Sequence, residues 1–219
     1  MFAGAGAIDV VTGGTGDDRI DGGGGNDTLS GGDGNDYIAG GLGADTINMG
    51  ATGQDWVVVA PEDTGVVVAI TGSVTAGQAI GALSFNSTAM DLVSGLVGQW
   101  HQDSVALLKT GESAYTEWLA NRAAEFPTKF AAGVLTNGST WGANNAGQIA
   151  AVRGNNAAGI FTASNTGADT ALIWDSDGTG NGGDRSAIIL VGKFWTTTNF
   201  PIFGFGGPQT GVFSMSGFE

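Results

Sequence analysis

The stretch Gly13 to Asn48 reads GGTGDDRID, GGGGNDTLS, GGDGNDYIA and GGLGADTIN, a nine-residue unit repeated four times without a gap. The sixth position of the unit is always aspartate and the eighth is always Ile or Leu. The phase extends upstream through Asp9 and Val11, and it slips by one residue downstream, where Asp55 and Val57 follow Gly53. A flexible glycine-rich linker would have no reason to keep this register, so the stretch predicts an ordered repeat structure.

Each position of the unit has a physical role. Glycines at positions one, two and four permit a tight turn with positive φ and bare backbone. The last three residues are expected to be extended, with their single apolar member pointing inward. A turn and a short strand make half a coil, so two units, or 18 residues, predict one full turn of a flattened parallel β-roll.

Stacking of such coils arranges the aspartates in columns. Asp9, Asp27 and Asp45 should line one edge of the roll, and Asp18 and Asp36 the other, with successive coils about 4.8 Å apart. Carboxylates this close repel one another unless a cation lies between them. Carboxylate and turn-carbonyl oxygens favour calcium over magnesium or zinc. The predicted metal-binding residues are Asp9, Asp18, Asp27, Asp36, Asp45, Asp55, Gly13, Gly14, Gly16, Gly22, Gly23, Gly25, Gly31, Gly32, Gly34 and Gly40.

The repeated unit resembles the nonapeptide calcium-binding repeats of RTX proteins, which form parallel β-rolls. This resemblance implies several bound calcium ions and export through a type I secretion apparatus, which uses a C-terminal signal. The N-terminus, MFAGAGAIDVV, lacks the basic start and apolar stretch of a conventional signal peptide. Because type I export does not need such a signal peptide, the resemblance implies a location outside the cell or at the cell surface.

Composition narrows the class of protein further. The chain has 219 residues, a net charge of −14 and only seven Lys and Arg, so we expect no binding to nucleic acid or to an anionic membrane. The absence of cysteine fits a secreted bacterial protein stabilised by metal rather than by disulfides. No apolar segment is long enough to span a membrane.

The fold class expected is mainly β, with the RTX roll over residues 1–60 and a β-rich domain over residues 61–219. Trp56 to Pro61 is predicted to be a strand leaving the roll. The second domain is expected to contain a helical insert near residues 88–126. Helices are predicted over residues 88–97 and over residues 112–126, where Pro127 ends the pattern.

The region from Thr162 to Gly192 resembles the C-terminal part of several RTX secreted and surface-layer proteins, with two apolar strands around an acidic loop. Asp175 and Asp177 have the first two spacings of a calcium loop, but Ser186 stands where the closing Glu is expected. We interpret residues 175–184 as an acidic hairpin loop, and a calcium loop remains the alternative.

The sequence contains none of the catalytic motifs that commonly accompany RTX repeats. It has no HExxH zinc motif and no GxSxG nucleophile elbow, and its single histidine, His101, has no partner for a zinc site. The expected function is non-enzymatic: a calcium-binding module that folds on calcium and self-assembles as a homo-oligomer or surface-layer-like structure. The alternatives are the secretion and folding tail of an RTX exoenzyme whose catalytic domain lies outside this chain, and a sugar-binding module.

Overall fold

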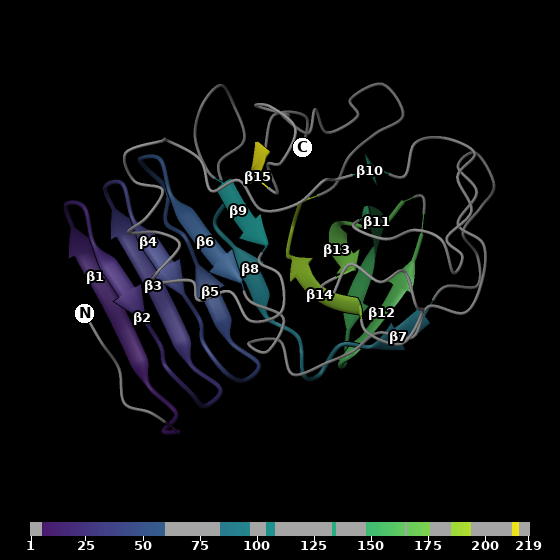
Figure 1. Cartoon of the computed structure of the whole chain (residues 1–219), viewed down its shortest axis with the longest axis horizontal. Helices are drawn as coiled ribbons and strands as arrows, with labels where there is room; N and C mark the ends of the chain where they lie inside the picture. Colours follow the sequence, from purple (N-terminus) through teal and green to yellow (C-terminus); the bar gives the residue numbers. More distant parts are fainter. Residues whose placement is uncertain are drawn as a thin grey trace.

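The computed structural model describes residues 6–59, 84–96, 104–107, 133–134, 148–164, 166–175, 185–193 and 212–214. Within these ranges the chain is built from short strands that join into two sheets, and the mainly β fold class is confirmed (Figure 1). The strands are β1 (Val10–Thr15), β2 (Arg19–Asp21), β3 (Thr28–Asp33), β4 (Tyr37–Ala39), β5 (Thr46–Asn48), β6 (Trp56–Val59), β7 (Ser84–Asn86), β8 (Leu92–Ser94), β9 (Ser104–Leu107), β10 (Gly133–Val134), β11 (Gln148–Ala157), β12 (Ile160–Ala163), β13 (Asp169–Asp175), β14 (Arg185–Leu190) and β15 (Val212–Ser214).

The repeats form the expected parallel β-roll. Strands β1, β3 and β5 pair in parallel in one sheet, and β2, β4 and β6 pair in parallel in the other. The register joins equivalent positions two units apart: Leu29 lies between Val11 and Ile47, and Ile38 lies between Ile20 and Val57. Strand β6 is a strand as predicted, but it does not leave the roll: Trp56 to Val58 pair with β4, and Val59 pairs with β9.

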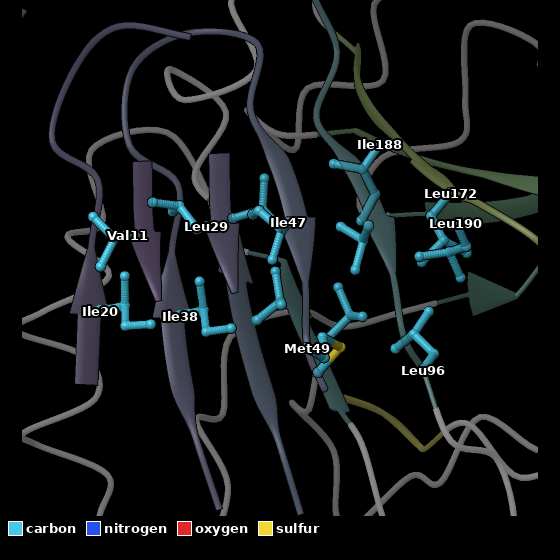
Figure 2. Packing of buried hydrophobic residues seen from close by; sticks show 14 residues of the cluster. Val11, Ile20, Leu29, Ile38, Ile47, Met49, Leu96, Leu172, Ile188 and Leu190 are labelled. Atoms are coloured by element: carbon cyan, nitrogen blue, oxygen red, sulfur yellow. The ribbon is translucent and has the colours of Figure 1, made fainter. Parts of the chain in front are cut away.

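The apolar residue at position eight of each unit fills the narrow space between the two sheets. Ile20, Ile38 and Ile47 are fully buried, and Leu29 is 1% exposed. Figure 2 shows these side chains in two facing rows, one from each sheet, with Val11 at the outer end of its row. Each of the four units supplies one side chain to this cluster, which makes a thin core, so packing alone stabilises the roll weakly.

Both sheets of the roll continue into later parts of the chain. Strand β8 pairs in parallel with β5 on one side and with β14 on the other. Strand β9 pairs in parallel with β6 and antiparallel with β15. Beyond β14 the first sheet becomes antiparallel, in the order β14-β13-β11-β12-β7.

The helix predicted over residues 88–97 is wrong. Residues 92–94 are strand β8, and Val93 is fully buried within the cluster that fills the roll. Pairing with β5 overrides the helical spacing of the local sequence, as tertiary contacts commonly do. The helix predicted over residues 112–126 lies outside the described residues.

Strands β13 and β14 form the antiparallel hairpin predicted around the acidic loop, with Asp175 paired to Arg185. Residues 176–184 and His101 lie outside the described ranges. No helix in the described part of the chain has the length and hydropathy needed to cross a membrane.

Candidate metal centre

The position-six aspartates form two ladders, one along each edge of the roll. On the first edge the Asp9 amide donates to Asp27 Oδ1 at 2.8 Å, and the Asp27 amide donates to Asp45 Oδ1 at 2.7 Å. On the second edge the Asp18 amide donates to Asp36 Oδ1 at 2.9 Å. The stacking derived from the sequence therefore holds, and each carboxylate reaches back to the preceding coil on its own edge.

Two further aspartates extend these ladders. Asp55 accepts the Asp36 amide at 2.8 Å, as its phase in the sequence suggested. Asp91, which was not among the predicted metal-binding residues, accepts the Asp45 amide at 2.9 Å. The sequence signal that could have found it is the Asp-x-Val pattern of residues 91–93, which recurs at residues 103–105.

A second oxygen of each central carboxylate is buried without a hydrogen bond. Asp27, Asp36 and Asp45 are each 1% exposed, and their Oδ2 atoms have no hydrogen-bond partner. Burial raises the pKa of Asp45 to about 6, and the neighbouring Asp27 carboxylate acts in the same direction. Burial also raises the pKa of Asp36, helped by the negative charges of Asp18, Asp17 and Asp33. Buried carboxylates of this kind need a compensating positive charge.

The glycine at position one of each unit leaves space beside these oxygens. A Cβ on Gly22 would lie 2.6 Å from Asp27 Oδ2 and would collide with the carbonyl oxygen of Gly40. A Cβ on Gly31 would lie 2.5 Å from the carbonyl oxygen of Met49 and would collide with Asp36 Oδ2. A carboxylate oxygen and a backbone carbonyl oxygen therefore both face the same bare Cα.

Positions two and four of the unit use glycine for a different reason. Gly14 and Gly16 have φ angles of 113° and 103°, which a side-chain-bearing residue resists. Position one does not require positive φ, contrary to the sequence-based expectation; it requires the absence of a Cβ. The other predicted glycines divide in the same way. Gly13 and Gly40 lack a Cβ beside a carboxylate, and Gly23, Gly25, Gly32 and Gly34 have positive φ.

The donors available to a cation are oxygens only. In the described ranges no group of three or more His, Cys, Asp or Glu side chains could hold a metal ion. A cation beside Asp27 or Asp36 would therefore be held by one or two carboxylates together with turn carbonyls. Calcium accepts this kind of mixed oxygen set with flexible geometry, so the site fits calcium.

A separate ladder lies at position five and runs in the opposite direction. The backbone amide of Asn35 donates to Asp17 Oδ1 at 2.9 Å, and the backbone amide of Gln54 donates to Asn35 Oδ1 at 2.8 Å. On the other edge the Ala44 amide donates to Asn26 Oδ1 at 3.2 Å. These side chains reach forward to the following coil, so each turn is fixed to both of its neighbours.

Comparison with known proteins agrees with this geometry. Residues 3–38 and 12–47 match the RTX calcium-binding nonapeptide repeat (4 copies). The N-terminal region of the chain therefore contains RTX repeats, a structural motif that binds calcium. The match ends before Asp55 and Asp91, so it does not include the last rungs of either ladder. A search of curated proteins finds no match to the chain.

Proposed function

We propose that this chain is a non-enzymatic, calcium-dependent module of the extracellular space or cell surface, whose roll folds when calcium binds. The observation that supports it most directly is that the buried Oδ2 atoms of Asp27 and Asp45 on one edge, and of Asp36 on the other, have no hydrogen-bond partner. Without a cation these charges oppose folding, and the thin core offers little to offset them. With calcium the same charges become ligands, and binding stabilises the folded roll by mass action.

The ligands in this proposal are the ladder aspartates and the turns that face them. Asp9 and Asp55 lie toward the ends of the repeats, while Asp27 and Asp36 each have a ladder aspartate on both sides. Central carboxylates can therefore serve two ions. Extracellular calcium modules bind with dissociation constants of about 10⁻⁴ to 10⁻³ M, well above cytosolic calcium. The chain would remain unfolded in the cell, pass through a type I secretion apparatus, and fold outside.

Calcium titration followed by far-ultraviolet circular dichroism tests the folding step. The EGTA-treated protein should lose most of the β signal of the roll, and calcium should restore it. Magnesium at equal concentration serves as the control and should restore little, because it demands a rigid octahedral set of ligands. A spectrum that EGTA leaves unchanged would contradict calcium-driven folding.

Self-association is the second part of the proposal, in line with a surface-layer-like or other extracellular structural role. Strands β1 and β2 end their sheets, and no described strand pairs with their outer edges. Unpaired strand edges are common sites of association between copies of a chain. Light scattering should show particles larger than a monomer at millimolar calcium. A strictly monomeric folded protein would favour the alternative function, the secretion and folding tail of an exoenzyme.

A further inference from the structure

Residues 91–94 form a repeat that is detached from the others in sequence but joined to them in space. Leu92 pairs with Thr46, Val93 with Ile47 and Ser94 with Asn48, which are equivalent positions of the fourth unit. Asp91 takes the place of the position-six aspartate. No glycine turn introduces it, because the residues before it are Phe-Asn-Ser-Thr-Ala-Met. Instead the chain arrives from β7, which pairs with β12 at the far edge of the same sheet.

Asp91 forms hydrogen bonds with the roll and, at the same time, with the antiparallel part of the first sheet. We call this part, made of β14, β13, β11, β12 and β7, the C-terminal sheet. Its Oδ1 atom accepts the Asp45 amide at 2.9 Å, and the Leu92 amide beside it donates to the Asp45 carbonyl at 2.8 Å. On the opposite side the Asp91 carbonyl accepts the Ile189 amide at 3.0 Å. The next bond in that direction is from the Val191 amide to the Val93 carbonyl at 2.8 Å. Strand β8 is thus the shared strand of two sheet regions.

The C-terminal sheet also depends on the roll for one of its two buried faces. Side chains alternate along β13 and β14, as strand geometry requires. Ala171, Ile173 and Ile189 pack in a cluster with Phe161 and Met90. The alternate residues belong instead to the cluster that fills the roll, together with Ile47, Val59 and Val93: they are Leu172, Ile188 and Leu190. Figure 2 shows this row of side chains continuing from the roll to β13 and β14.

Removing the roll would expose those three aliphatic side chains, each of which is 0% exposed in the folded chain. It would also leave β8 without β5 on its outer edge, and so remove the backbone pairing that holds β8 beside β14 on that side. In the absence of the roll the antiparallel sheet therefore has an incomplete core, and the outer edge of β8 is unpaired.

From these contacts we infer that Asp91 and strand β8 transmit calcium-driven ordering of the roll to the C-terminal sheet, so that the two regions fold as one unit. This inference rests on the proposed calcium-driven folding of the roll. Asp91 acts here as a positioning residue: its carboxylate fixes β8 against the fourth unit, and β8 completes the sheet at β14. Calcium-driven folding thus extends over the roll and the C-terminal sheet, although the matched repeats lie only in the roll.

Hydrogen–deuterium exchange measured by mass spectrometry over a calcium titration separates the two regions. Peptides from residues 28–48 report on the roll, and peptides from residues 169–175 and 185–190 report on the C-terminal sheet. In the wild-type protein both sets should gain protection at one calcium midpoint. Roll peptides that ignore calcium would contradict the proposed function itself. Roll peptides that respond while the C-terminal sheet is equally protected with and without calcium would overturn only the coupling.

Variants locate the coupling at Asp91. In Asp91→Ala the roll peptides should still respond, while C-terminal protection at a fixed calcium concentration should fall about tenfold or more, the loss expected for a hydrogen bond to a charged group. Asp91→Asn keeps an Oδ1 acceptor and should preserve a single midpoint. Asp27→Ala, on the same ladder but inside the roll, should move both midpoints together to higher calcium.

Asp91→Ala could fail to fold, so that neither region gains protection when calcium is added. In that case Asp27→Ala decides: midpoints that move together support one folding unit, and a shift confined to the roll peptides contradicts it. If Asp91→Asn lowers C-terminal protection as much as Asp91→Ala does, the hydrogen bond is not the connecting element.

Discussion

Replacing Gly22 with alanine should remove a calcium site without removing any of the oxygen atoms around it. The added Cβ would lie 2.6 Å from Asp27 Oδ2 and 3.2 Å from Leu29 Cδ1, and would collide with the carbonyl oxygen of Gly40. The Gly40 segment is itself held in the next coil, where the Gly22 amide donates to the Ala39 carbonyl at 2.9 Å. The neighbours therefore have little freedom to move away from the methyl group.

The size of the effect follows from this crowding. Overpacking a fixed interior typically costs about 1–3 kcal/mol, and contact with a backbone oxygen places Gly22→Ala toward the upper end of that range. The methyl group would also fill the space beside Asp27 that a cation needs. We therefore expect both a destabilised roll and one fewer bound calcium ion.

Gly24→Ala is the matched control within the same unit. Gly24 occupies the variable third position, does not have positive φ, and its added Cβ would meet no atom closer than the Gly6 nitrogen at 3.3 Å. The equivalent positions hold Thr15, Asp33 and Leu42, so a side chain is tolerated there. Its effect on the free energy of unfolding should stay within about 1 kcal/mol.

Isothermal titration calorimetry gives the number of ions bound, and urea unfolding at saturating calcium gives the free energy of unfolding. Gly22→Ala should reduce both quantities relative to Gly24→Ala. If the two variants bind the same number of ions and unfold at the same urea concentration, the space beside Asp27 is not a cation site and the reasoning fails.

Two further predictions concern the aspartates themselves. The raised pKa of Asp45, about 6 against a usual 3.8, means that the calcium-free folded roll binds protons more tightly than the unfolded chain does. The stability of the calcium-free roll should therefore be greatest below about pH 4 and fall as the pH rises through 6. Acidifying the EGTA-treated protein should recover part of the β signal in circular dichroism. The Asp45→Asn variant should show a smaller pH dependence. Position along the ladder should matter as well: Asp27→Ala or Asp36→Ala should raise the calcium midpoint of folding more than Asp9→Ala, because Asp9 has a ladder neighbour on one side only among the described residues. Equal midpoints for all three variants would argue against shared ions.

The roll could be predicted from sequence because its physical requirements recur in phase. Each unit repeats the same need for an inward apolar residue, a carboxylate and bare turn backbone, so four copies reinforce one interpretation. The columns of Asp27 and Asp36 followed directly from that period. What could not be read was the cause of each glycine: positions two and four need positive φ, whereas position one needs the space that a Cβ would occupy.

Asp91 could not be predicted in the same way because its unit keeps only the strand half of the motif. The turn that normally precedes the aspartate is replaced by a chain coming from β7, so no glycine marks the start. Pairing with β5 is a long-range contact between residues 46 and 92, which local spacing does not encode. The interpretation as a helix used local spacing alone and was wrong for that reason.

The hairpin between β11 and β12 could not be predicted from the sequence because of the residues in its turn. Ala157 pairs with Ile160, which leaves a two-residue turn of Ala158 and Gly159. Both residues have positive φ, 52° and 75°, as a tight hairpin turn requires. Alanine rarely adopts this conformation, so the sequence offered only half of the usual Asn-Gly signature and the turn was not recognised.

The strict alternation of units between two sheets has a consequence for how this protein can change in length. Counted from Gly13, the odd units add to the sheet of β2, β4 and β6, and the even units add to that of β1, β3 and β5. Deleting a single nonapeptide would reverse the parity of everything after it. Strand β8 would then meet the sheet that now receives β9, and its aspartate would face the wrong edge. Deleting or inserting two units preserves parity and changes the roll by one whole coil. The unit by which this protein can be lengthened or shortened is therefore 18 residues, the span that separates Asp9 from Asp27.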